Sequence, residues 1–362
     1  MIINKTILIV IVIFALVGAA DKVCGNKLGL GEKFDEGIKT TGDLILTMLG
    51  MMVLAPLLAE WLLPLLMPIY RLVGSDPAMF AGTFLPNDMG GASLARMLTD
   101  NEAAAKFSGL IVASMLAPTL IFTIPLGMKI LNKEDHPTFF EAISCGLITI
   151  PLASFIGGLS AGFGIGEMLL NLSTIIIFVL ILLVGIVKFR DMILKVFNVF
   201  AKLINVIIMA GLCLAIVQSV LGITLMEKVG DFKEALLIIG QIGLLLAGAF
   251  PMMDVLIRVL EKPLNVISKK FAISNAAIGG MVAGLANTII TFKMVETMDE
   301  KGKLLAIAFC VSAGFVFGDH LGFTAVFDDT MIVPMLVGKM VGGITAFGMA
   351  TLYWNKVLVK SH

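Results

Sequence analysis

Long apolar runs recur along the whole chain, and they constrain its fold more than any other feature. They lie at roughly 3–20, 43–68, 77–98, 107–131, 140–162, 167–188, 200–221, 235–260, 275–295, 304–327 and 331–354. A helix of about 20 apolar residues spans the hydrocarbon core of a bilayer, where backbone groups must be paired within the segment. The sequence therefore predicts an all-α, polytopic transmembrane bundle of about 10–11 helices.

The composition supports this fold class and excludes several functions. Hydrophobic residues make up 59% of the 362 positions and charged residues only 14%, whereas soluble domains carry about 25% charged residues. The formal net charge is zero, so the chain has no basic face for nucleic acid. The four cysteines form no CxxC pair, so no metal or cofactor is expected. They are Cys24, Cys145, Cys213 and Cys310.

The two halves of the chain resemble each other. "SDPAMFAGTFLPND" at 75–88 aligns with "SNAAIGGMVAGLANT" at 274–288, which places Asn87 and Asn287 at equivalent positions. Such duplication is common in transporters, although chance similarity between membrane segments is the alternative. We predict one membrane domain with two structural repeats, 1–199 (first repeat plus a linker helix) and 200–362 (second repeat). Lys and Arg are spread evenly over the loops, so membrane orientation and inversion of the repeats stay open.

A polar interruption divides the apolar segment 77–98. Pro86 removes a backbone donor, Gly90 and Gly91 free the backbone, and Asn87 and Asp88 lie between them. Irregular backbone at membrane depth is tolerated where it lines a cavity. A carboxylate beside unpaired carbonyl groups suits a small cation, which makes this break a candidate substrate site. The alternative is a structural cap on the second half-helix.

The segment 304–327 contains a second interruption, with Asp319 and His320 between Gly318 and Gly322. A charge at mid-membrane costs about 2.5–3.5 kcal/mol even on insertion scales, and histidine titrates near neutral pH. These residues are therefore predicted to bind substrate. The alternative is a hydrogen bond that joins two helices. Asn287 is a further candidate, since its amide can bond a hydroxyl group, or else an adjacent helix.

Other polar and aromatic residues have weaker assignments. Phe84 and Phe323 flank the breaks and suit cation–π contact with an ammonium group, although packing is the common role of phenylalanine. Asp328 and the residue after it are interpreted as a solvated loop or vestibule. Lys293 and Lys339 are expected to extend toward the membrane surface.

The motifs "MFAGTFLPNDMGG", "VSAGFVFGDHLGF" and "MIVPMLVGKMVGGITA" resemble the ethanolamine-utilisation permease family, EutH. The similarity runs through most of the chain. It implies a multi-pass protein of the bacterial cytoplasmic membrane that admits ethanolamine to cells which degrade it with a cobalamin-dependent lyase. The resemblance carries over no binding residues, so the candidate site depends on the physical argument alone.

The expected function is therefore a permease that facilitates uptake of protonated ethanolamine, notably at low pH. The alternative is a sodium- or proton-coupled transporter of another small amine or amino-acid-like solute. An intramembrane enzyme is not expected, because "FVFGD" has Val316 in place of the first glycine of a GxGD motif and no HExxH motif occurs. The expected partners are ethanolamine and the lipid bilayer, with the oligomeric state left open.

Overall fold

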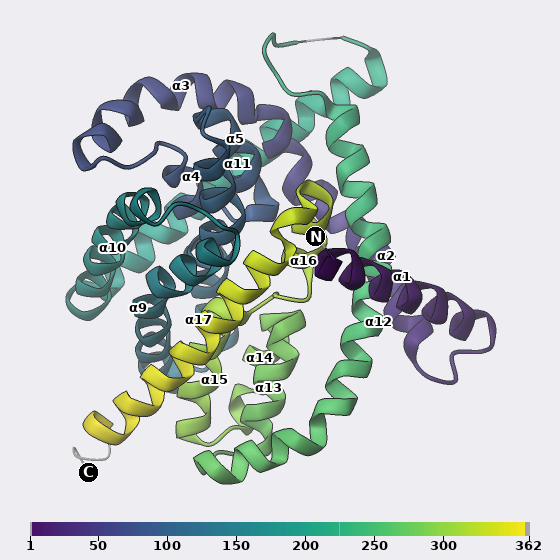
Figure 1. Ribbon diagram of the computed structural model, residues 1–362, viewed down its shortest axis with the longest axis vertical. Helices are drawn as coiled ribbons and strands as arrows, with labels where there is room; N and C mark the ends of the chain where they lie inside the picture. The colour runs from purple at the N-terminus through teal and green to yellow at the C-terminus, as the bar shows by residue number, and fades with distance from the viewer. Residues whose placement is uncertain (1, 224, 359–362) are drawn as a thin grey trace.

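The computed structural model describes residues 2–223 and 225–358, and in these ranges the chain is helical without any strand (Figure 1). Eight helical segments in the described ranges are long and apolar enough to cross a membrane. The other apolar segments predicted from the sequence, 77–98, 275–295 and 304–327, form shorter or interrupted helices. The all-α polytopic bundle is thus confirmed.

Long helices form the framework of the bundle. The helix α2 continues through the π-turn η1 into α3, and η8 leads directly into α17. The bounds are α1 (Ile2–Val23), α2 (Leu30–Leu44), η1 (Ile45–Leu49), α3 (Gly50–Val73), η6 (Lys133–Asp135), α9 (His136–Ser160), α10 (Ile165–Lys188), α11 (Arg190–Leu221), α12 (Phe232–Phe271), η8 (Asp329–Met331), α17 (Ile332–Tyr353) and η9 (Trp354–Leu358).

In the described residues, four broken helices complete the bundle, and each is interrupted near its middle. The first comprises α4 (Met79–Phe84), η2 (Asn87–Met89) and α5 (Gly91–Leu98). The second comprises α6 (Glu102–Lys106), η3 (Phe107–Ile111), η4 (Val112–Ser114), α7 (Leu116–Pro118), η5 (Thr119–Thr123) and α8 (Ile124–Ile130). The third comprises α13 (Asn275–Ala286), α14 (Thr288–Met294) and η7 (Val295–Thr297). The fourth comprises α15 (Glu300–Ala313) and α16 (Asp319–Phe327). The interruptions predicted in 77–98 and 304–327 are confirmed, and the other two were not predicted.

The second and fourth broken helices lie antiparallel to each other. Contacts at both ends and in the middle show this: Lys106 with Asp328 at 3.0 Å, Thr119 with the Val311 carbonyl at 3.4 Å, and Asp135 with Lys303 at 2.7 Å. The interruptions of both helices therefore lie at a similar depth in the bundle.

The long helices of the two predicted repeats contact each other in a reciprocal pattern. The helix α1, which begins the predicted first repeat, packs on α12, and α11, which begins the second, packs on α3. The helices α9 and α17, each of which follows two broken helices, pack on each other. Two intertwined halves would produce this pattern, and the division into repeats stays a prediction. The predicted boundary between residues 199 and 200 lies inside the continuous helix α11.

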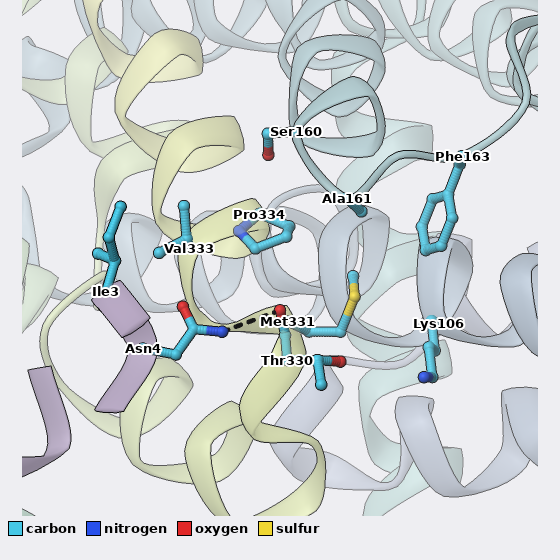
Figure 2. Close-up of a pocket in the computed structure, with 10 residues that line it drawn as sticks. All are labelled: Ile3, Asn4, Lys106, Ser160, Ala161, Phe163, Thr330, Met331, Val333 and Pro334. Atoms are coloured by element: carbon cyan, nitrogen blue, oxygen red, sulfur yellow. Dashed lines mark hydrogen bonds between the residues drawn. The ribbon is translucent and has the colours of Figure 1, made fainter. Parts of the chain in front are cut away.

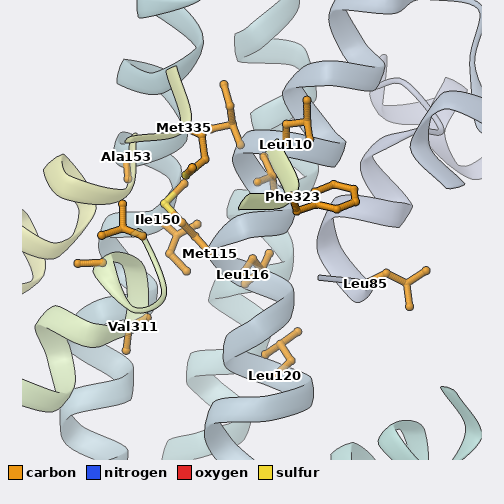
Figure 3. Packing of buried hydrophobic residues seen from close by; sticks show 14 of the residues in the cluster. Leu85, Leu110, Met115, Leu116, Leu120, Ile150, Ala153, Val311, Phe323 and Met335 are labelled. Atoms are coloured by element: carbon orange, nitrogen blue, oxygen red, sulfur yellow. The ribbon is translucent and has the colours of Figure 1, made fainter. Parts of the chain in front are cut away.

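The helices α9 and α17 pack side by side and antiparallel, since Thr149 contacts Gly342 and Gly157 lies beside Pro334 (Figure 1). A Cβ atom on Gly157 would lie 3.0 Å from the Pro334 carbonyl oxygen and 3.2 Å from Gly338 Cα. Small residues of this kind let membrane helices approach closely. Apolar side chains of both helices and of the second and fourth broken helices form the surrounding core, including Met115, Ile150, Val311, Phe323 and Met335 (Figure 3).

Candidate functional site

The break in the first broken helix follows from its proline and glycines. Leu85 is extended and Pro86 adopts ψ 148°, so the helix ends and a short 3₁₀ turn follows. Gly90 then adopts φ 94°, a conformation that favours glycine. A Cβ atom on Gly90 would lie 1.9 Å from Met51 Cγ. The turn that carries Asn87 and Asp88 is therefore fixed by local sequence and by close packing, and α5 begins at Gly91.

Asn87 and Asp88 lie inside the bundle with polar atoms that no protein group pairs. Asn87 is fully buried, and neither atom of its amide has a hydrogen-bond partner. One carboxylate oxygen of Asp88 is also buried without a partner. Buried polar groups are almost always hydrogen-bonded, because an unpaired group costs about 1–3 kcal/mol. These atoms are thus available to a ligand or to water.

The fourth broken helix contributes Asp319 and His320. Gly318 precedes α16, and Asp319 occupies its first turn, where the helix dipole favours a negative charge. His320 is 3% exposed, and its Nδ1 atom has no partner. The preceding loop is anchored because the Phe315 and Phe317 amides donate to the Gly284 and Leu285 carbonyls, each at 3.0 Å.

These breaks converge in one region. The helix α16 of the fourth broken helix packs against the turn η2, and η2 also contacts η4 of the second broken helix. Asp88 and Asp319 are close enough to interact electrostatically. The structure therefore brings together the two carboxylates that the sequence places more than two hundred residues apart.

Lys339 joins this region and corrects one expectation. It was expected to extend toward the membrane surface, but it is 1% exposed in α17, and its ammonium donates to the Ser114 carbonyl at 2.5 Å. That carbonyl has no intrahelical partner at i+4, because Pro118 has no N–H. Lys339 also lies in electrostatic range of Asp88.

Asn287 interrupts the third broken helix in a different way. Its side-chain oxygen accepts from the Ile289 amide at 2.9 Å and so caps α14. Asn287 is extended, and the neighbouring Gly284 and Leu285 carbonyls bind the loop before α16. Its amide oxygen therefore already has a backbone partner, unlike that of Asn87.

Phe84 and Phe323, which were predicted to line the site, pack against other phenylalanine rings. The Phe84 ring packs edge-on against Phe178 and Phe200, with centroids 5.2 and 5.6 Å away. Phe323 is buried in the core and stacks on Phe327 (Figure 3). These contacts indicate packing roles. Gly322, predicted in the break, lies inside α16.

Several buried hydroxyl groups were missed by the sequence analysis. Each has no hydrogen-bond partner, and four of the five belong to broken helices. They are Ser93, Ser154, Thr288, Ser312 and Thr324. Because serine and threonine are common in membrane helices, their type gives no signal; only the fold shows that these hydroxyls are unpaired.

An ion-pair cluster lies at one end of the antiparallel helix pair. Asp328, which directly follows α16, binds Lys106 at 3.0 Å and lies 4.0 Å from Arg96. Burial alone would raise the pKa of Asp328, but hydrogen bonding from Thr330 and the Lys106 ion pair lower it below its usual range. The carboxylate is 10% exposed, so the interpretation of Asp328 as a plain solvated loop residue is wrong.

A cavity of about 260 Å³ adjoins this cluster. Lys106 and Phe163 lie on one side of it, and Ile3 and Asn4 lie on the other, with Thr330 between them (Figure 2). Asn4 of α1 donates to the Asp329 and Thr330 carbonyls at 2.7 and 3.2 Å, which attaches the first helix to η8, directly before α17. The cavity is therefore bounded by elements from both halves of the chain.

Apolar membrane-spanning helices around a buried, partly unpaired polar centre define a helical membrane permease. The profile of the ethanolamine utilisation protein EutH family matches residues 3–353. The chain therefore belongs to the EutH family and is a multi-pass protein of the bacterial cytoplasmic membrane.

Relatives support this membership over nearly the full length. The chain is 44% identical over 359 residues to the probable ethanolamine permease EutH of Listeria monocytogenes serotype 1/2a, covering 99% of this chain and 96% of the relative. It is 37% identical over 388 residues to the probable ethanolamine permease EutH of Escherichia coli K12, covering 97% and 95%. No solved structure matches the chain significantly.

Proposed function

We propose that this protein is an ethanolamine permease that binds the protonated solute where the broken helices converge. The names of the relatives suggest ethanolamine as the solute, and the buried polar groups without partners offer a binding site for it. The proposal extends to facilitated uptake at low pH, where almost all of the amine is charged.

The chemistry of ethanolamine fits this region. An alkyl ammonium ion resembles that of lysine, with a pKa of roughly 10, so in acid the neutral form is scarce. The charged form does not cross lipid unaided. A carrier must replace the water around one ammonium group and one hydroxyl group.

One observation carries the proposal: Asn87 is fully buried with both amide atoms unpaired, beside a carboxylate that is itself incompletely paired. An ammonium group donates three hydrogen bonds, and Asp88 and Asp319 supply anionic acceptors. Asn87 and His320 supply uncharged partners for the hydroxyl group. The helix breaks let these groups meet at membrane depth.

The membrane potential is sufficient to drive uptake of a cation. An inside-negative potential contributes about 2.3 kcal/mol per 100 mV for each positive charge that enters. A facilitator of protonated ethanolamine therefore requires no coupling ion.

Uptake of labelled ethanolamine into proteoliposomes at acidic pH tests the proposal. We expect saturable uptake that rises with an imposed inside-negative potential and is lost in Asp88→Asn and Asp319→Asn. Asp329→Asn changes an exposed aspartate beside Asp328 and serves as the matched control, with uptake retained. Normal uptake by both site variants would remove these carboxylates from the mechanism.

Competition measurements distinguish this function from coupled transport of another solute. Choline and amino acids should compete weakly with ethanolamine, and a sodium gradient should leave uptake unchanged. Sodium-dependent uptake, or stronger competition by an amino acid than by ethanolamine itself, would contradict the proposal.

A further inference from the structure

Lys339 places a buried amino group, positively charged when protonated, within the polar centre formed by Asn87, Asp88, Asp319 and His320. Its side chain is 1% exposed and lies in electrostatic range of Asp88 and His320. Its ammonium hydrogen-bonds the Ser114 carbonyl, so it is held in place and not shared with solvent. The proposed transport step makes no use of this charge.

The hydrogen bond alone does not account for a lysine at this position. The Ser114 carbonyl requires one donor because Pro118 supplies none. A neutral amide side chain supplies that donor without the cost of burying a charge. The positive charge of Lys339 therefore has a role beyond capping the broken helix.

That role follows from the charges that surround the polar centre. Two carboxylates, Asp88 and Asp319, and the Lys339 ammonium leave one net negative charge when all are ionised. Asp43 also interacts with Asp319, but its side chain is exposed and screened by solvent. One monovalent cation balances the centre, whereas a second ammonium group meets an uncompensated positive charge.

We propose that Lys339 is a specificity-determining residue that restricts the site to solutes with a single ammonium group and rejects diamines. This inference rests on the proposed function. Repulsion between like charges is strong at a desolvated site. Burial and the hydrogen bond to the second broken helix hold Lys339 at the site.

Ethylenediamine is the matched probe, because a second ammonium group replaces the hydroxyl group of ethanolamine at mildly acidic pH. We expect wild-type protein in proteoliposomes to take up ethanolamine in preference to ethylenediamine by about a hundredfold. Lys339→Gln retains a donor for Ser114 and removes the charge, so the preference should fall by about tenfold or more. Lys339→Arg retains the charge and should retain the preference.

The controls separate selectivity from folding. Lys228→Gln removes the same charge at an exposed position and should keep the wild-type preference. Lys339→Met provides a second neutral variant if Lys339→Gln does not fold. Equal uptake of both amines by wild-type protein overturns the inference without any variant.

The outcomes also separate this inference from the proposed function. Failure of wild-type protein to take up ethanolamine contradicts the proposed function and the inference with it. Ethanolamine uptake with an unchanged preference in a folded Lys339→Gln or Lys339→Met variant contradicts only the inference about Lys339.

Discussion

The Lys106 ammonium lies 3.0 Å from the Asp328 carboxylate and joins the start of the second broken helix to the end of the fourth. At the opposite end of the same helix pair, Lys303 lies 2.7 Å from Asp135. Between these ion pairs the fourth broken helix carries Asp319 and His320, and the second carries Ser114, whose carbonyl accepts from Lys339. The ion pairs therefore fix the two helices that surround the site at each end.

Asp328→Asn should destabilise the protein by about 1–3 kcal/mol, because the ion pair is partly buried and its loss leaves Lys106 with a weaker partner. Thermal denaturation in detergent measures the change. Asp329→Asn, one residue further along at an exposed position, is the matched control and should remain close to wild type. Equal effects of both substitutions would show that the ion pair contributes nothing specific.

The stability contributed by Asp328 should persist at mildly acidic pH. The fold lowers the pKa of Asp328 through Thr330 and Lys106 despite burial. A carboxyl group with a lowered pKa stabilises the fold above its unfolded pKa of about 3.9, and this stabilisation is lost as the pH falls through the folded value. The difference in melting temperature between wild type and Asp328→Asn should therefore be constant from neutral to mildly acidic pH and narrow only below about pH 4. A difference that disappears near neutral pH would contradict this assignment.

The interruption of the first broken helix could be predicted from the sequence because its causes are local. Pro86 and Gly90 act on their own backbone, so the turn and the position of Asp88 follow from a few adjacent residues. The break before Asp319 is predictable for the same reason, since Gly318 lies beside it. The eight segments of the described residues that are long and apolar enough to cross a membrane likewise follow from apolar length.

The roles of residues whose partners lie far away in the sequence could not be predicted. Lys339 is separated from its acceptor Ser114 by 225 residues. Pro118 was the available signal, because it frees the carbonyl at i−4, but the sequence does not show which group binds that carbonyl. The role of Asn287 as a cap also depends on tertiary structure, since loop amides pair with the preceding carbonyls.

Gly90→Ala should abolish ethanolamine uptake and strongly reduce the yield of folded protein. The added methyl group meets Met51 Cγ at 1.9 Å, and φ 94° is unfavourable for alanine. Gly240→Ala in α12 is the matched control, because nothing lies within 4 Å of the added atom. Alanine is favoured over glycine within helices by about 1 kcal/mol, so Gly240→Ala should be neutral or slightly stabilising. Size-exclusion chromatography and melting temperature measure both variants, and a well-folded Gly90→Ala protein would contradict the packing described for this turn.

Asn87→Ala and Asn287→Ala should have opposite effects on stability and on ligand binding. Asn87 has no partner for its amide, so its removal should leave the substrate-free protein as stable as wild type or slightly more stable. The same change should abolish the rise in melting temperature that bound ethanolamine produces. Asn287→Ala removes a helix cap and should cost about 1 kcal/mol, while the ethanolamine-dependent rise is retained. Because both variants replace the same residue type, thermal shift measurements with and without ethanolamine separate an amide reserved for the solute from one used by the fold. A retained ligand shift in Asn87→Ala would exclude Asn87 from the binding site.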